Sequence, residues 1–238
     1  MKLYCMKLGW IVPFHLPITG YLVQTDDGLN ILVDTGISRH FIETHSFHGQ
    51  PFARMGEAED VVNQLARVGL APHDIHLLIS SHFDPDHAGN LTAFSRAHIV
   101  VQRRQYLVAK EGTIVRQEAL RSQWDAPELR YQLVDGDTTL LPGIELIETS
   151  GHSPGHQSVL VRLPQKGPVL LAIDAIPSAG CLDPDTRPLT PFDMDEEEVR
   201  ASTRKLIALA ERERVTLIVH GHDREQWQQL KLLPECYT

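Results

Sequence analysis

The sequence predicts an α+β fold in which two strand-rich halves pack together with helices outside, as one domain over residues 1–238. Three observations favour this fold. Short apolar runs bounded by turn residues alternate with segments of helical spacing. The length of 238 residues, with 42% hydrophobic and 22% charged residues, is typical of one large globular domain. The second half loosely repeats the order of elements of the first, with no linker between them.

The first half begins with strands and continues with a loop, a helix and a further strand. The predicted strands are Leu3–Lys7, Gly20–Thr25, Asn30–Val33 and Ile75–Ile79. The hairpin signal Asp26-Asp27-Gly28 separates the second from the third. Residues 38–56 show no periodicity and predict a long loop of the kind that often forms a lid or binding surface. Glu57–Val68 has helical spacing, and Gly69 ends it.

The second half contains more strands and the clearest helix. Its predicted strands are Ile99–Gln102, Gly143–Thr149, Ser158–Leu163, Val169–Ile173 and Thr216–His220. Arg104–Lys110 predicts a short helix, and Thr113–Ser122 either a polar helix or a lid. Residues 177–192 are proline-rich and irregular. Asp195–Arg214 predicts a long helix, because its acidic first turn and later basic residues complement the helix dipole.

Composition narrows the function classes. A net charge of −9 with no Lys/Arg run longer than two argues against nucleic acid or an anionic membrane as partner. No apolar stretch approaches the roughly 20 residues of a membrane span, and charges interrupt the first residues where a signal peptide is apolar. We therefore expect a cytoplasmic protein. The three cysteines, Cys5, Cys181 and Cys236, predict reduced thiols, whereas 13 histidines predict a metal centre of nitrogen and oxygen donors.

Four metal-ligand side chains lie within six positions directly after the strand Ile75–Ile79. They are His82, Asp84, Asp86 and His87. Two imidazoles and two carboxylates in one turn lose solvation and repel like charges unless a cation compensates them. The alternative is a polar surface turn with scattered histidines. The crowding favours a metal site.

Three other predicted strands also end on a histidine or an aspartate. His152 follows Gly143–Thr149, Asp174 follows Val169–Ile173, and His222 follows Thr216–His220. A single histidine after a strand is commonly a solvated residue, but four strand ends of this kind indicate one shared site. The seven donors exceed the capacity of one tetrahedral ion and suit two ions that share a carboxylate.

The chain resembles the metallo-β-lactamase-fold hydrolases, and within them the N-acyl homoserine lactonases, the quorum-quenching enzymes. The matching motifs are Ile31-Leu-Val-Asp34-Thr-Gly36, Ser80-Ser-His82, Asp86-His87-Ala-Gly89, Val100-Val-Gln-Arg103, Gly151-His152-Ser-Pro-Gly-His-Gln-Ser158, Leu170-Leu-Ala-Ile-Asp174-Ala and Gly221-His222-Asp223. The resemblance implies a four-layer αββα sandwich with a dinuclear metal centre between the sheet edges. It also implies hydrolysis of a lactone ring by attack of a metal-bound hydroxide.

The resemblance further implies a role for each donor. His82, Asp84 and His152 would bind one ion, Asp86, His87 and His222 the other, and Asp174 would bridge them. Zinc is the expected metal, with iron, manganese and cobalt as alternatives. Asp86 would carry a proton to the departing alkoxide. His156 would hold a ligand loop in place, His220 is the alternative to His222, and Asp34 would support the site without binding the ion.

The sequence departs from the family pattern at two positions. Asp84 stands where the family has histidine, and its charge favours harder ions such as iron or manganese. Pro177 stands near the position of a tyrosine that contacts the substrate carbonyl in this group. Tyr21 or a metal-bound water are candidate replacements for that hydroxyl.

The expected partner is a small-molecule lactone, and a homodimer is left open. The acyl chain would lie against apolar side chains of loop 38–56 and the N-terminal strands, namely Phe41, Phe47, Phe52, Met55, Trp10 and Phe14, with Phe47, Met55 and Tyr21 as substrate contacts. Three alternatives remain: a hydrolase of the same fold acting on another lactone, an ester or a phosphotriester; a redox di-iron protein; and a non-catalytic module that senses a metabolite.

Overall fold

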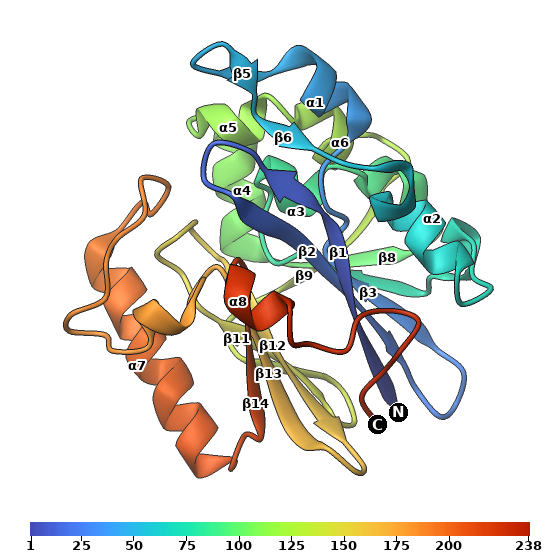
Figure 1. Ribbon diagram of the computed structural model, residues 1–238, viewed down its shortest axis with the longest axis vertical. Helices are drawn as coiled ribbons and strands as arrows, with labels where there is room; N and C mark the ends of the chain where they lie inside the picture. The colour runs from blue at the N-terminus through green and yellow to red at the C-terminus, as the bar shows by residue number, and fades with distance from the viewer.

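Two large β-sheets lie face to face in the computed structural model, which describes residues 1–238 (Figure 1). The first sheet has seven strands, in the order β6 (Ala53–Arg54), β1 (Lys2–Ile11), β2 (Leu16–Gln24), β3 (Asn30–Val33), β7 (Leu77–Ile79), β8 (His98–Gln102) and β9 (Arg130–Val134). The second has five, in the order β10 (Thr138–Leu141), β11 (Ile144–Glu148), β12 (Gln157–Leu163), β13 (Gly167–Ile173) and β14 (Leu217–His220). A separate two-stranded ribbon pairs β4 (Ser46–Phe47) with β5 (Gln50–Pro51).

Helices cover the outer face of each sheet. The helices are α1 (Arg39–Thr44), α2 (Val61–Ala66), α3 (Pro85–Ala88), α4 (Arg103–Glu111), α5 (Val115–Glu118), α6 (Arg121–Trp124), α7 (Glu196–Arg212) and α8 (Arg224–Trp227), with 3-10 turns η1 (Glu57–Glu59), η2 (Pro72–Asp74), η3 (Leu91–Phe94) and η4 (Ala179–Cys181). The long helix α7 lies on the five-stranded side, and α1 to α6 lie on the seven-stranded side (Figure 1). The predicted α+β class and the αββα sandwich are confirmed.

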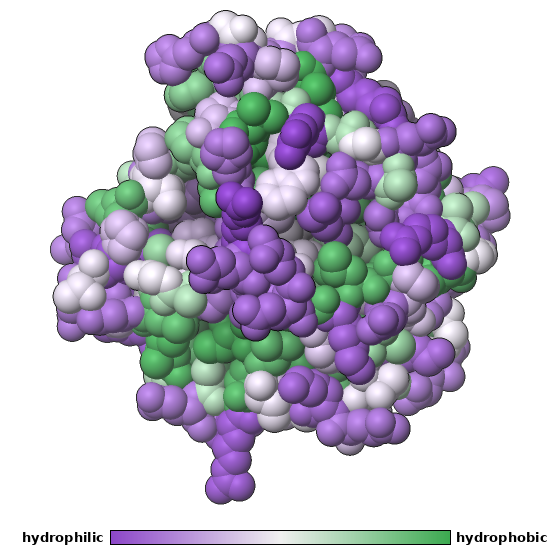
Figure 2. All heavy atoms as spheres, viewed as in Figure 1, coloured by the Kyte–Doolittle hydropathy of each residue, from purple (hydrophilic) through white to green (hydrophobic).

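Strand alternation explains the three apolar cores of this sandwich. Leu3 and Cys5 of β1 enter the core between the sheets, whereas Tyr4 and Met6 enter the core beneath the helices of the first sheet. Successive side chains of a strand point to opposite faces, so each strand serves two layers. In the second sheet, Leu170 of β13 packs instead into the core that includes residues of α7. The exterior in Figure 2 is largely hydrophilic, with hydrophobic residues in smaller patches. No helix combines the length and apolar character needed to cross a membrane.

Most predicted elements occur, with shifted boundaries. The helix predicted at 195–214 is α7, and Asp195 caps it by accepting a hydrogen bond from the Glu198 amide at 2.9 Å. The helix predicted at 57–68 is divided into η1 and α2, because Asp60 is extended and caps α2. The loop predicted at 38–56 contains α1 and three short strands. The strands β9 and β10 were missed, because each is half-exposed and lacks a continuous apolar run.

Parallel pairing brings the site together. β3, β7 and β8 run parallel in the first sheet, and β13 and β14 run parallel in the second. The carboxyl ends of parallel strands lie at one edge of a sheet. The segments that follow β7, β13 and β14 carry His82, Asp174 and His222, and the Asp174 carboxylate lies within 4 Å of both imidazoles at this edge.

Candidate metal centre

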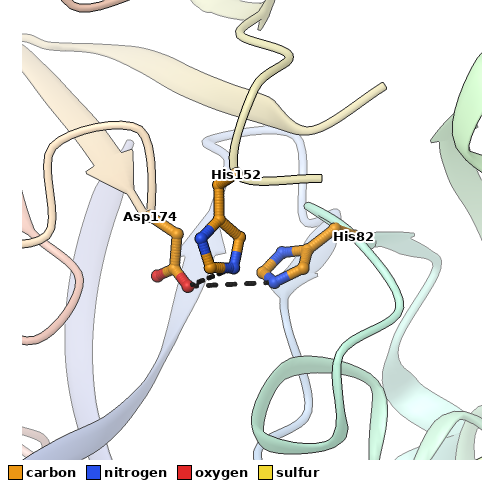
Figure 3. A group of neighbouring side chains, drawn as sticks. All are labelled: His82, His152 and Asp174. Atoms are coloured by element: carbon orange, nitrogen blue, oxygen red, sulfur yellow. Dashed lines mark ion pairs between the residues drawn. The ribbon is translucent and has the colours of Figure 1, made fainter. Parts of the chain in front are cut away.

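Two groups of buried side chains could each hold a metal ion. The His82 group consists of His82, His152 and Asp174, and the Asp86 group consists of Asp86, His87 and His222. Figure 3 shows the first group, with the two imidazoles and the carboxylate directed at one another. The ligand atoms within each group lie within 4.8 Å of one another. The structure thus brings together six of the seven predicted ligands as two groups.

Asp174 lies between the two groups. Its Oδ2 atom is 3.2 Å from His152 Nε2 and 3.8 Å from His82 Nε2. The same carboxylate is 3.5 Å from His87 Nε2 and, through Oδ1, 3.0 Å from His222 Nε2. One carboxylate in reach of four imidazoles is the arrangement that a ligand shared by two ions requires.

Unsatisfied buried nitrogens indicate that cations fit here. His82 Nε2 and His87 Nε2 are buried and have no hydrogen-bond partner. A buried polar atom without a partner is costly, typically by about 1–3 kcal/mol. One divalent cation in each group would satisfy these atoms, and nitrogen and oxygen donors of this kind suit zinc and neighbouring transition metals.

The other ring nitrogen of each histidine has a partner. His87 Nδ1 lies 2.9 Å from Asp34 Oδ2, His152 Nδ1 lies 3.1 Å from Asp193 Oδ1, and His222 Nδ1 lies 2.8 Å from the Pro17 carbonyl. These acceptors place the proton on Nδ1 and leave the Nε2 lone pair free for an ion. The supporting role expected for Asp34 thus has a geometric basis, whereas sequence reasoning missed Asp193.

Ser81 links the two groups. Its hydroxyl donates to Asp34 Oδ2 at 2.7 Å and lies 2.9 Å from His82 Nδ1, from which it can accept. Asp34 also accepts from the Ser81 amide at 2.8 Å. One buried carboxylate therefore orients His87 directly and His82 through Ser81.

Neighbouring carboxylates and imidazoles shift the pKa values of the candidate ligands. Burial alone would lower the pKa of His152, but Asp174, Asp193 and Asp84 raise it to about 10. Burial opposes ionisation of Asp174, yet His222, His87 and His152 hold the pKa of its carboxyl well below its usual range. Burial and the nearby His87 lower the pKa of His82. The site is thus a set of ionised carboxylates that attract positive charge.

Asp84, which precedes α3, contacts both the His82 group and α5. Its Oδ2 lies 3.3 Å from His152 Nε2 and 3.6 Å from His82 Nε2. The same oxygen accepts from Arg116 Nε at 2.6 Å, and Oδ1 accepts from Gln117 Nε2 at 3.1 Å. Sequence reasoning did not find Arg116 or Gln117, because a polar four-residue helix carries no signal of a long-range contact.

His156 and His220 lie outside both groups. His156 Nδ1 lies 2.8 Å from Thr149 Oγ1, and its Nε2 accepts from the Asp174 amide at 3.3 Å. These contacts place His156 against the loop that carries Asp174. His220 Nδ1 lies 3.1 Å from the Ile176 carbonyl, and His222, not His220, belongs to a group that could hold a metal ion.

The backbone before Asp174 packs closely against the turn that carries His222. Ile173 has a left-handed φ of 52°, an unfavourable conformation for a β-branched residue. A Cβ at position 221 would lie 2.8 Å from both Asp174 Oδ1 and the Ile173 carbonyl oxygen, so only glycine fits there.

An apolar cavity of about 370 Å³ opens onto both groups. Asp84, Asp86, His152, Asp174 and His222 line its polar end, and its walls include Ile11, Phe14, Leu16, Phe41, Phe52, Pro177, Leu189 and Phe192. Phe14 packs against Phe192 with ring centroids 5.8 Å apart. The size and the apolar lining are typical of a small-molecule site.

The predicted substrate contacts lie at different depths. Phe47 lines an adjacent hollow that shares Phe41, Phe52 and Arg116 with the cavity. Met55 is half-buried and does not line the cavity. Tyr21 is fully buried and packs on Trp227 in the core between the sheets, so the expected substrate contact by Tyr21 does not fit this structure. Leu189 and Phe192 come from the irregular segment 177–192 and were missed.

Known proteins are similar to this chain in sequence and in fold. A profile of the Metallo-beta-lactamase superfamily matches residues 15–222. The N-acyl homoserine lactonase AiiA of Bacillus thuringiensis subsp. kurstaki is 37% identical over 227 residues, which cover 93% of this chain and 87% of the relative. The N-acyl homoserine lactonase AttM of Azorhizobium caulinodans is 36% identical over 77% of this chain and 71% of its own length.

Solved structures agree. An N-acyl homoserine lactone hydrolase with N-hexanoyl-L-homoserine bound at its catalytic metal center superposes with a TM-score of 0.86 at 33% identity, over 99% of this chain and 98% of that chain. The dizinc quorum-quenching lactonase AidC superposes with a TM-score of 0.67 at 20% identity, over 88% of this chain and 73% of that chain, and supports the fold alone.

Proposed function

The chain belongs to the metallo-beta-lactamase superfamily, and on this premise we propose that it hydrolyses the lactone ring of N-acyl homoserine lactones. One observation carries the proposal. The shared carboxylate Asp174 lies between two buried ligand groups at the polar end of an apolar cavity. Relatives at 36–37% identity are N-acyl homoserine lactonases, and one solved relative contains the ring-opened product at its metal centre.

The proposed centre assigns every donor. His82, Asp84 and His152 would bind one ion, Asp86, His87 and His222 would bind the other, and Asp174 would be the ligand common to both. We propose zinc as the metal, because histidine nitrogens and carboxylate oxygens are its usual donors. When bound, two such ions supply an activated water and polarise a carbonyl oxygen.

The protein's own residues then bind the substrate and move a proton. The walls around Phe14, Phe41 and Phe192 bind the acyl chain and exclude water from the reacting carbonyl. Water adds to the carbonyl carbon, and the ring C–O bond breaks. Asp86 lines the cavity beside His87, with its Oδ2 3.4 Å from His87 Nε2. Its carboxylate accepts a proton from the attacking water and passes it to the departing alkoxide, which becomes the hydroxyl of the acyl homoserine product.

A substrate panel with defined metal content tests the proposal. Protein loaded with two zinc ions per chain is incubated with homoserine lactones of short and long acyl chain, a lactone without the acyl amide, an ester and a phosphotriester. Ring opening is followed by mass spectrometry and proton release. We expect the acylated lactones to have the highest kcat/KM. Turnover of the ester or phosphotriester alone, or none at all in metal-replete protein, would contradict it.

A further inference from the structure

Asp84 is held by two consecutive residues of α5. Arg116 Nε donates to Asp84 Oδ2 at 2.6 Å, and Gln117 Nε2 donates to Asp84 Oδ1 at 3.1 Å. Both carboxylate oxygens thus have a partner from a helix 32 or 33 positions away in sequence. Asp84 is only 5% exposed and Gln117 only 1%, so water competes little with these bonds.

Arg116 is itself fixed in place. Its Nη2 donates to the His152 carbonyl at 3.2 Å, so one guanidinium contacts a carboxylate and the backbone of a predicted ligand. It is also the only lysine or arginine among the cavity-lining residues. A planar guanidinium with several donors can hold a carboxylate while it contacts other acceptors.

A buried hydrogen-bond network fixes Gln117. Its Nε2 also donates to Ser153 Oγ at 2.9 Å, and its Oε1 accepts from Gln105 Nε2 at 2.9 Å. Ser153 Oγ in turn donates to Gln105 Oε1 at 2.7 Å, which closes the ring. The three side chains are almost fully buried. The amide that contacts Asp84 is therefore oriented by α4 and by the turn that carries His152.

We propose that Arg116 and Gln117 are positioning residues that hold Asp84 as a ligand of the ion at the His82 group, and that Arg116 offsets the charge Asp84 adds. Asp84 Oδ2 lies 3.3 Å and 3.6 Å from the two Nε2 atoms of that group. Ligand atoms about 2.0–2.2 Å from a tetrahedral ion are separated by about this distance. Oδ2 has a second lone pair for the Arg116 bond.

Charge explains why an arginine is needed. Asp86 and Asp174 already supply two carboxylates to the centre, and Asp84 removes one further unit of positive charge from its ion-loaded state. The guanidinium of Arg116 carries one positive charge, which returns that unit. Asp84 with Arg116 is thus electrically equivalent to a neutral ligand. The inference depends on the metal centre of the proposed function but not on its substrate.

Metal titration of apoprotein tests the inference without any substrate. Zinc is added to the apo wild type and to Arg116→Met in competition with a chromophoric chelator, which resolves two dissociation constants. We expect Arg116→Met to weaken one of the two sites by about 10–100-fold and leave the other unchanged. Arg116→Lys, which keeps the charge, should recover part of the loss. Arg103→Met, which removes an exposed pair with Asp135, is the matched control.

A mutant cycle separates positioning from general stability. If Arg116 acts through Asp84, Arg116→Met adds no further loss to Asp84→Asn. The Asp84→His/Arg116→Met double variant should bind both ions more tightly than either Arg116→Met or Asp84→His alone. Wild-type affinity at both sites in Arg116→Met, equal loss at both, or additive losses with Asp84→Asn would overturn the inference. If the selective loss occurs but lactones are not hydrolysed, the inference stands and the proposed function fails.

Discussion

The two ligand groups differ in what supports them. In the Asp86 group, His87 is held by Asp34 at the end of β3 and His222 by the Pro17 carbonyl of β2, both part of the seven-stranded sheet. In the His82 group, His152 is held by Asp193, and Asp84 is held beside it by the short helix α5. One site is therefore built on the sandwich itself, and the other is completed by surface segments. We expect the second to be the weaker and more adjustable site.

Substitution of Asp174, the proposed bridging ligand, should remove the ions from both groups and so have the largest effect. Asp174→Asn deprives both ions of a carboxylate, so we expect loss of both ions and a decrease in kcat/KM of about a thousandfold or more, equal to several kcal/mol. Elemental analysis and turnover measure the two effects. Asp185→Asn, an exposed acid paired with Arg204, is the control and should have no effect. Retention of two ions in Asp174→Asn would refute its bridging role.

The carboxylates that contact the Nδ1 atoms of His87 and His152 should each affect the metal affinity of one group. Asp34→Asn should weaken the Asp86 group, and Asp193→Asn the His82 group, each by about 10–100-fold in affinity. Asp34→Asn should also weaken the other site to a lesser extent through Ser81. Competition titrations on each apoprotein give the two constants. Identical profiles for the two variants would show that the supports are not selective.

The pH dependence of metal binding should be steeper for the Asp86 group. Burial would lower the pKa of both His87 and His222, but Asp174 and Asp86 raise both, so we expect an ion at this group to displace a proton from each of them. In the His82 group only His152, with a pKa raised to about 10, must release a proton, because the pKa of His82 is lowered.

Each proton displaced changes the affinity about tenfold per pH unit. Affinity should therefore increase with pH at both sites, and about twice as steeply on a logarithmic scale at the Asp86 group. The stability of the apoprotein depends on pH in the opposite direction to metal affinity. The raised pKa of His152 contributes to the free energy of unfolding in full below about pH 6.5, and this contribution is lost as pH rises through about 10. Calorimetry in buffers of different ionisation enthalpy counts the protons, and equal counts would be inconsistent with this difference.

The smallest effect is expected for the link between the groups. Ser81→Ala removes the hydroxyl between His82 and Asp34. A hydrogen bond of this kind contributes about 1 kcal/mol, or roughly fivefold in affinity. Loss confined to the His82 group, measured by the same titration, would fit a support that ends at His82. A larger loss at the Asp86 group would show that Ser81 mainly fixes Asp34.

Strand-end ligands could be predicted from sequence, and their supports could not. An apolar run followed by a histidine or aspartate predicts a strand with a polar residue at its carboxyl end, and this pattern selected His82, Asp174 and His222, which the structure brings together as candidate ligands. Arg116 and Asp193 lie in polar segments without periodicity, and they reach the site only through packing between elements far apart in sequence. The same limit applies to Tyr21. The sequence places it on a strand but does not show which face of the sheet its side chain lies on, and in the structure it packs in the core between the sheets.

The strained backbone at Ile173 has a consequence for engineering. A β-branched residue held at φ 52° stores about 1–3 kcal/mol of strain. Replacement by glycine would release this energy, but Ile173 is fully buried in the core between the sheets, and loss of its side chain would cost more, about 2–5 kcal/mol. The same replacement would loosen the residue that precedes Asp174 and opposes Gly221. Position 173 is therefore a poor target for stabilisation, because its strained residue both fills the core and holds the proposed bridging carboxylate in place.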